Sequence, residues 1–280
     1  MLGGRCRVKS KYRLWDMSWR EAQEAFERTE TAIVPVGTLH AHGPTPISID
    51  ASSVEKLADE VGKRTGILVA PLVAYGEDDK MLGYPGSIAI QPSTLENLYF
   101  DICKSLNRNG IKKVIFINGH GGNRETLIRT GRRVKELGML AAIVEWWVIG
   151  PKVIPELFPN SDVYMEELAV AVAIGGTKIA DLRRGGYKGE WGVNPTRNIL
   201  GEKIKPIRFN DFTYKGAKII IPVDAWDIDV DAPPEVSEEE LEPLAKRGQE
   251  IISHLADFIA EFAQDFESTT IPTSTKFTTA

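Results

Sequence analysis

Apolar and polar positions follow a regular order along the first half of the chain. Short apolar runs predict buried strands, and the segments between them have apolar residues at helical spacing. The strands are predicted at residues 32–36, 67–74, 113–117 and 140–148, and the helices at 18–28, 50–63, 93–109 and 124–137. This alternation of strand and helix predicts an α/β fold with a mainly parallel sheet flanked by helices.

Polar residues at the predicted helix starts have the chemistry of caps. Ser18 is expected to cap the first helix, and Asp50 or Ser52 the second. Ser93 and Glu96 have the spacing of a capping box, which predicts the start of the third helix.

The second half of the chain follows a different pattern. A helix with small apolar residues is predicted at 162–174, and residues 175–232 are rich in Gly, Pro and aromatic residues, with one strand at 218–223. Ser237 and Glu240 predict a capped helix through Phe266, and the Thr-rich residues 267–280 are expected to form a flexible tail. Because no linker or repeat separates the halves, residues 1–266 are expected to form one domain.

The composition excludes several classes of protein. Among 280 residues, 34 Lys and Arg face 39 Asp and Glu, and no dense basic run suggests a nucleic-acid surface. Two cysteines cannot form a disulfide framework, so a reducing, cytoplasmic location is expected. No apolar run approaches the roughly 20 residues of a membrane span, and residues 1–15 lack the apolar core of a signal peptide.

Three of the four histidines lie just after predicted strands: His40, His42 and His120. Ligands of parallel α/β sheets bind at these carboxyl ends. Alternate side chains of an extended segment point the same way, so His40 and His42 can face one ion, and Asp50 could add a carboxylate. Imidazole and carboxylate ligands are typical of zinc and related divalent ions. Two adjacent carboxylates near the start of a later helix, Glu166 and Glu167, are both candidates for proton transfer.

Each of these residues also has a simpler interpretation. The histidines could be hydrogen-bonded turn residues, and Asp50 could be only a helix cap. Glu166 and Glu167 could be favoured by the helix dipole. Trp191 could form a wall of a substrate pocket or belong to the core. Asp78 and Asp79 could be a solvated loop, or could reach a substrate.

The patterns resemble the creatininase (creatinine amidohydrolase) family of metal-dependent hydrolases. The matching segments are P-V-G-T-L-H-A-H-G-P at 35–44 followed by Asp50, Y-P-G-S at 84–87, N-G-H-G-G-N at 118–123 and, more weakly, D-V-Y-M-E-E-L-A at 162–169. The resemblance implies His42, Asp50 and His120 as metal ligands, Asp50 as a possible bridge between two ions, and Glu167 as a carboxylate near them. His40 occupies the place of a family Glu ligand. Substrate contacts are expected from Tyr84, Ser87, Gly121 and Trp191.

The chain departs from the family pattern at four other points. The spacing from His42 to Asp50 is one residue shorter than usual, and Thr45 replaces a His. Asp162 replaces a His that serves catalysis in creatininase itself, and creatininase proper has a ligand Glu where this chain has Gly122. Creatinine is therefore not the expected substrate, and a site with one ion is an alternative to a site with two.

The expected function is hydrolysis of a small cyclic amide or related C–N bond by metal-activated water, with one or two Zn²⁺ or Mn²⁺ ions. One alternative is ring opening of an inositol-derived cyclic ketone, as in 3-dehydro-scyllo-inosose hydrolase among the family's relatives. Others are a non-catalytic metabolite-binding protein and an interaction protein with structural histidines. The resemblance also implies a homo-oligomer, specifically a hexamer, that binds a small molecule and neither nucleic acid nor membrane.

Overall fold

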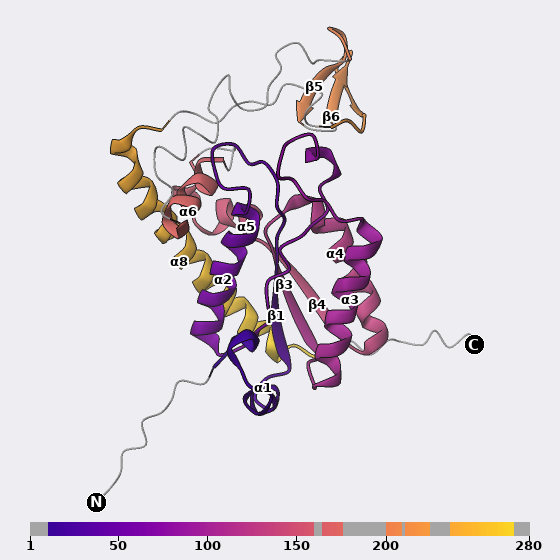
Figure 1. Cartoon of the computed structure of the whole chain (residues 1–280), viewed down its shortest axis with the longest axis vertical. Helices are drawn as coiled ribbons and strands as arrows, with labels where there is room; N and C mark the ends of the chain where they lie inside the picture. Colours follow the sequence, from indigo (N-terminus) through magenta and orange to yellow (C-terminus); the bar gives the residue numbers. More distant parts are fainter. Residues whose placement is uncertain (1–10, 160–163, 176–199, 209–210, 225–235, 272–280) are drawn as a thin grey trace, which may run out of the picture.

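A parallel sheet of four strands forms the centre of the molecule (Figure 1). The computed structural model describes residues 11–159, 164–175, 200–208, 211–224 and 236–271. From one edge to the other, the strands are β2 (Leu68–Val69), β1 (Thr31–Val36), β3 (Lys113–Asn118) and β4 (Leu140–Glu145). Because all pairings are parallel, the carboxyl ends of the strands lie along the same edge of the sheet.

Helices cover both faces of this sheet because successive strand side chains point to opposite sides. Ile33 and Ile115 pack toward α2 (Ile49–Thr65), α5 (Trp146–Val153), α6 (Tyr164–Gly175) and α8 (Glu238–Ser268). Val34 and Phe116 pack toward α1 (Trp19–Phe26), α3 (Pro92–Arg108) and α4 (Arg124–Arg133). The predicted fold class is confirmed. Short 3-10 helices occur at Leu14–Asp16, Asp79–Met81, Gly121–Asn123, Val134–Leu137 and Pro155–Leu157.

Two predicted helix caps are wrong. The N-cap of α2 is Ser48, and Asp50 and Ser52 lie inside the helix, so the Asp50 side chain is free for another role. Helix α3 begins at Pro92 after the N-cap Gln91, and Glu96 forms ion pairs with Arg129 and Arg133 of α4 instead of capping its own helix. A proline at the first helical position needs no capped N–H, which explains the earlier start.

Other helix ends follow the sequence prediction. Ser18 caps α1 in a full capping box with Glu21, and Ser237 caps α8 with Glu240. Helix α8 continues to Ser268, so Glu267 is not part of a tail; its backbone carbonyl accepts a hydrogen bond from Lys113 at the start of β3. Residues 272–280 lie outside the described part of the chain.

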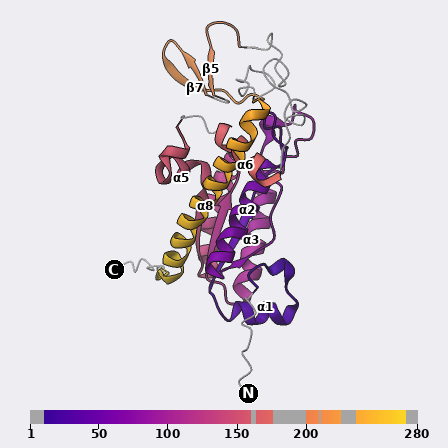
Figure 2. The same ribbon diagram turned by 90° about the vertical axis from the view of Figure 1, so that its left-hand side faces the viewer.

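The strand predictions differ from the structure in three places. The run at 67–74 yields only the short edge strand β2, and β4 ends at Glu145, where α5 begins. The single strand expected at 218–223 is one of three in a small antiparallel sheet, β5 (Lys205–Arg208), β6 (Asp211–Tyr214) and β7 (Ala217–Ile220). Figure 2 shows this sheet at one end of the molecule, beyond the α/β body. No helix in the described ranges has both the length and the apolar character that crossing a bilayer would demand.

Candidate metal centre

The three turn histidines meet at the carboxyl edge of the parallel sheet. His40 and His42 follow β1, and His120 follows β3, which pairs directly with β1. Asp50 lies in the first turn of α2 and is buried with His40 and His120. The ring centroid of His40 is 5.2 Å from that of His42 and 4.8 Å from that of His120. The prediction that these four residues share one site therefore agrees with their placement.

Asp50 is the centre of the cluster. Its Oδ2 lies 2.9 Å from His40 Nε2 and 2.9 Å from His120 Nδ1. Its Oδ1 lies 3.6 Å from His42 Nε2. One buried carboxylate that faces three imidazoles has the geometry of a ligand able to contact more than one ion.

The electrostatics of the cluster favour an ionised Asp50. Burial alone would raise its pKa, but the positive charge of His42 and the hydrogen bonds from His120 and His40 hold the pKa well below its ordinary value. Burial would lower the pKa of His120, but the hydrogen bond and charge of Asp50, together with Asp78, raise it to about 9. Without a bound cation, the negative charge of the carboxylates is therefore balanced by protonated imidazole.

The structure separates the roles of the two adjacent glutamates in α6. The Glu167 Oε2 atom lies 3.2 Å from His42 Nε2, so this carboxylate faces the histidine cluster. Glu166 is fully buried and forms an ion pair with Arg247 of α8. Glu167 is thus the candidate for site chemistry, and Glu166 links two helices.

Asp78 is one of the two loop aspartates for which the sequence left a solvated loop and a contact with substrate as alternatives. Its side chain is 1% exposed, whereas the neighbouring Asp79 is exposed, so the expectation of a solvated loop is wrong for Asp78. Its Oδ2 lies 3.4 Å from His40 Nδ1, and its Oδ1 lies 3.6 Å from His120 Nε2. His40, Asp78 and His120 form one of two groups in the described chain that could hold a metal ion, and His40, His42 and Asp50 form the other.

Two asparagines of the N-G-H-G-G-N segment hold the loops of the site together. The Asn118 side chain donates to the backbone oxygen of His120 and accepts from its backbone nitrogen. The Asn123 side chain donates to the backbone oxygen of Gly37 and accepts from the backbone nitrogen of Glu77. These amides connect the ends of β1 and β3 with the loop before Asp78. The match to the family pattern was the only signal in the sequence that could have indicated them.

Two glycines allow this close packing. A Cβ at Gly119 would lie 1.8 Å from the backbone oxygen of Asp50, so only glycine lets the start of α2 approach β3. A Cβ at Gly122 would lie 2.1 Å from the backbone oxygen of Glu77 and 2.6 Å from His120 Nε2. A carboxylate side chain at position 122 therefore has no room in this arrangement.

The predicted substrate contacts have different surroundings. Gly121 lines a hollow of 460 Å³ together with Glu77, Asp78 and residues 222–224. The Ser87 hydroxyl accepts a hydrogen bond from the backbone nitrogen of Ala41, so it positions the loop between His40 and His42. Tyr84 is buried and is not among the residues that line the hollow. Trp191 lies outside the described residues, so its contact stays a prediction.

The donor set fits a divalent cation. Neutral imidazole and carboxylate are the protein ligands of catalytic zinc, and both kinds converge here in a largely buried position. Within the described part of the chain, neither side-chain oxygen of Asp78 has a hydrogen-bond partner. The Nδ1 atom of His40 has none there either. Buried polar atoms normally have such partners, so these atoms are consistent with a site organised around an ion.

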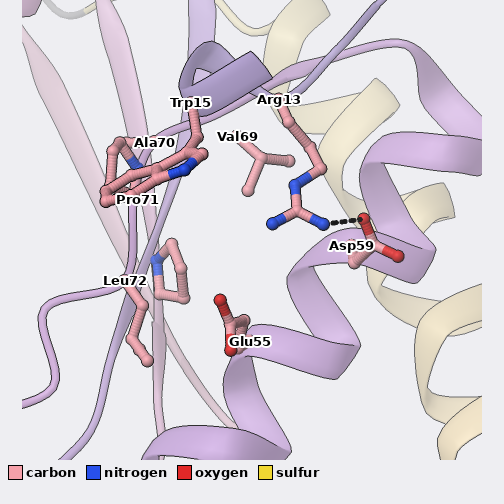
Figure 3. Close-up of a pocket in the computed structure, with 9 residues that line it drawn as sticks. Arg13, Trp15, Glu55, Asp59, Val69, Ala70, Pro71 and Leu72 are labelled. Atoms are coloured by element: carbon pink, nitrogen blue, oxygen red, sulfur yellow. Dashed lines mark ion pairs between the residues drawn. The ribbon is translucent and has the colours of Figure 1, made fainter.

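A second pocket of 280 Å³ lies between α2 and the edge of the sheet (Figure 3). Arg13 and Asp59 form an ion pair of 3.6 Å there, and Glu55 and Trp15 also line the space. It has no lining residue in common with the histidine cluster, and no histidine or cysteine lines it. The hollow beside Gly121 is lined by Asp78, which contacts His40 and His120, whereas none of the four predicted ligands is among the described residues that line either space.

Known sequences match the part of the chain that contains this centre. Residues 15–179 match the family described as "Creatininase: Creatinine amidohydrolase". The mycofactocin precursor peptide peptidase of Mycolicibacterium smegmatis is 35% identical over 102 residues, or 34% of this chain and 41% of that protein. The 3-dehydro-scyllo-inosose hydrolase of Thermotoga maritima is 28% identical over 107 residues, 38% of this chain and 34% of that protein.

The creatinine amidohydrolase of Pseudomonas putida is 24% identical over 161 residues, which are 52% of this chain and 62% of that protein. The chain thus spans less than two thirds of the length of each of these three relatives. Among solved structures, creatinine amidohydrolase (creatininase) has a TM-score of 0.67 at 19% identity, covering 94% of this chain and 100% of that one. A structure described as creatininase Mn has a TM-score of 0.65 at 19% identity, covering 92% of this chain and 100% of that one. These structures share the fold.

Proposed function

This chain belongs to the creatininase family, and from that premise we propose that it is a metal-dependent hydrolase of a small cyclic amide or related C–N bond. The observation that supports the proposal is the convergence of three imidazoles and two carboxylates, Asp50 and Glu167, at the carboxyl edge of the sheet. Among the relatives, one is named as an amidohydrolase and another as a peptidase. Both names describe hydrolysis of a C–N bond, which favours an amide as the substrate.

His40, His42, Asp50 and His120 would hold the metal, and Glu167 lies beside His42. A bound divalent ion supplies Lewis-acid activation of water and of the scissile carbonyl. The relatives include structures described as containing Mn and Zn, so either ion is a candidate for this chain. This ligand set is compatible with one or two ions per chain. The two side-chain oxygens of Asp50 face different histidines, so each oxygen could bind its own ion.

Glu167 is the residue best placed to move a proton. Its carboxylate is mostly buried and faces His42 at 3.2 Å, so a water held beside this histidine would lie within its reach. It would accept a proton from that water and deliver it to the leaving nitrogen. Asp50 keeps the imidazoles oriented. The hollow beside Gly121, which Asp78 also lines, is the proposed entry for a substrate.

Metal analysis and two variants test this function. We expect one or two ions per chain after reconstitution with Zn²⁺ or Mn²⁺, and less than about 0.1 ion would contradict the proposal. His120→Ala should lose the ion and all turnover while the free energy of unfolding changes by less than about 2 kcal/mol. Glu167→Gln should keep the ion and lose activity by about 10²–10⁴-fold, as expected for a proton-transfer group. Glu156→Gln, at an exposed position, is the matched control.

The substrate class is tested by a panel monitored by product mass. Creatinine and other cyclic amides, a short peptide and 3-dehydro-scyllo-inosose represent the chemistries named in the relatives. We expect the gain of one water by a cyclic amide. Turnover of the inosose alone would support the second candidate, ring opening of a cyclic ketone, which the resemblance to the Thermotoga maritima enzyme favours.

A further inference from the structure

The Asp78 carboxylate occupies an unusual position beside His40 and His120. Its side chain is 1% exposed, and neither oxygen has a hydrogen-bond partner in the segments that the structure describes. The nearest charged groups are His40 Nδ1 at 3.4 Å and His120 Nε2 at 3.6 Å. Burying a carboxylate without such bonds is strongly unfavourable, so this placement calls for a role that offsets the cost.

Asp50 and Asp78 face opposite nitrogens of the same two rings. Asp50 Oδ2 lies 2.9 Å from His40 Nε2 and 2.9 Å from His120 Nδ1. Asp78 faces the remaining nitrogen of each ring, at the longer distances of 3.4 and 3.6 Å. In a neutral imidazole one nitrogen has a hydrogen and the other a lone pair, so each ring can offer a lone pair on only one of these two sides.

The backbone identifies the side for His120. Its Nε2 lies 3.1 Å from the backbone oxygen of Glu77, and a carbonyl oxygen can only accept a hydrogen bond. Nε2 therefore holds the hydrogen in the neutral ring, and the lone pair on Nδ1 points toward Asp50. An ion bound by His120 through Nδ1 would lie on the Asp50 side of the ring.

We propose that Asp78 is a positioning residue that orients His40 and His120 for metal binding. Its negative charge faces the outward nitrogens of both rings, at 3.4 Å from His40 Nδ1 and 3.6 Å from His120 Nε2, and so favours a hydrogen on each of them. In the metal-bound protein this would leave His40 Nε2 and His120 Nδ1 with lone pairs beside Asp50, while the hydrogen on His120 Nε2 bonds to the Glu77 carbonyl. A carboxylate that accepts the second N–H of a metal-ligating histidine fixes the tautomer and raises the basicity of the ligand. This inference rests on the metal centre of the proposed function and adds a residue that does not touch the ion.

A direct ligand role for Asp78 agrees less well with the contacts. An ion on its side would need the lone pair of His120 Nε2, and the hydrogen bond to the Glu77 carbonyl would be lost. An ion on the Asp78 side of His120 would also lack a ligand from position 122. A Cβ there would lie 2.6 Å from His120 Nε2, so a side chain has no room.

Zinc affinity tests the proposal with a control at the next residue. Asp78→Asn and Asp78→Ala remove the buried charge, and Asp79→Asn makes the same change in charge at an exposed position. The zinc dissociation constant of each variant is measured by competition with a chromophoric zinc chelator. We expect both Asp78 variants to bind as many zinc ions per chain as the parent protein. Their zinc dissociation constants should be about 10–100-fold higher. Asp79→Asn should keep the parent affinity.

Three outcomes are distinguishable. Unchanged zinc affinity in both Asp78 variants would contradict the positioning role and leave the proposed function intact. Loss of one ion per chain would overturn it in favour of a direct ligand. Failure of the parent protein to bind zinc would contradict the proposed function, and this inference with it.

Nitrogen NMR of the parent protein supplies a test that needs no variant. With only four histidines in the chain, ¹⁵N-histidine labelling gives a simple spectrum, and the exposed His254 of α8 serves as an internal reference. In the zinc-loaded protein we expect His120 to be coordinated through Nδ1 and His40 through Nε2, each with a hydrogen on its other nitrogen. Coordination of either ring through the opposite nitrogen would overturn the proposal.

Discussion

At the scale of single residues, Gly122 decides which ligand set this chain can have. Its position is enclosed by the backbone oxygen of Glu77 and by His120 Nε2, at 2.1 and 2.6 Å from a Cβ built there. A buried carboxylate is instead supplied by Asp78, which approaches His120 from the loop after β2. The chain therefore combines a glycine in the N-G-H-G-G-N segment with a buried aspartate elsewhere.

The substitution Gly122→Ala is expected to damage the metal centre. The added methyl group must displace either Glu77 or His120, so the zinc dissociation constant should rise at least about tenfold, and stability should fall by about 1–3 kcal/mol. Titration with a zinc chelator and urea unfolding measure the two effects. Gly121→Ala is the control for affinity, because a Cβ at Gly121 meets nothing within 4 Å. Equal zinc affinities for the two variants would contradict the close packing described for Gly122.

At the scale of secondary-structure elements, the contact of α6 with α8 positions Glu167. A Cβ at Gly248 of α8 would lie 2.0 Å from the backbone oxygen of Ala169 in α6, so the two helices touch backbone to backbone there. The buried Glu166 and Arg247 form an ion pair across the same interface. The helix that presents Glu167 to His42 is thus fixed by a partner more than 70 residues later in the chain.

Gly248→Ala should separate α6 from α8. We expect a loss of about 1–3 kcal/mol in the free energy of unfolding, because backbone cannot move aside as a flexible side chain can. Denaturant unfolding followed by circular dichroism measures the loss. Gly131→Ala in α4 is the matched control: its Cβ would lie 3.5 Å from Ala141 Cβ, an ordinary contact, and the change should stabilise by about 0.5–1 kcal/mol. A stabilised Gly248→Ala variant would show that the helices do not meet at this point.

At the scale of the whole molecule, two tryptophan side chains near the amino-terminal end of the described chain are unusually exposed to solvent. Trp15 is 74% exposed and Trp19 is 70% exposed. Tryptophan is seldom left in water to this extent, and it is enriched in subunit interfaces. Together with the family resemblance, this exposure supports the prediction of a homo-oligomer.

Light scattering after size exclusion tests this prediction. The chain has a mass of 31.0 kDa, and we expect a species of several times that mass, with six subunits as the specific expectation from the family. The double variant Trp15→Ser, Trp19→Ser should shift the distribution toward the monomer if these side chains lie in the interface. A parent protein that elutes at 31.0 kDa at micromolar concentration would contradict the prediction.

Much of the fold and part of the site were predictable from the sequence because they depend on local patterns. Apolar runs and helical spacing identified β1, β3 and the helices beside them, and parallel strands necessarily bring His40, His42 and His120 to one edge. The irregular stretch before α8 gave such a pattern only at 218–223, so β7 was predicted and the other two strands of its small antiparallel sheet were missed. Helix starts were wrong where a side chain served another helix or the site, as Glu96 and Asp50 do.

The sequence by itself determined the order of the elements, the family and the imidazole part of the candidate centre, because each follows from residues close together in the chain. The sequence also indicated Asp50, but only the tertiary structure decided between Glu166 and Glu167 and showed that Asp78 lies beside the histidines. Asp78 is buried because the loop after β2 lies against His40 and His120, and Glu166 is withdrawn from the site because Arg247 lies opposite it. The charge and burial of a carboxylate depend on neighbours that are distant in sequence, and no local spacing contains that information.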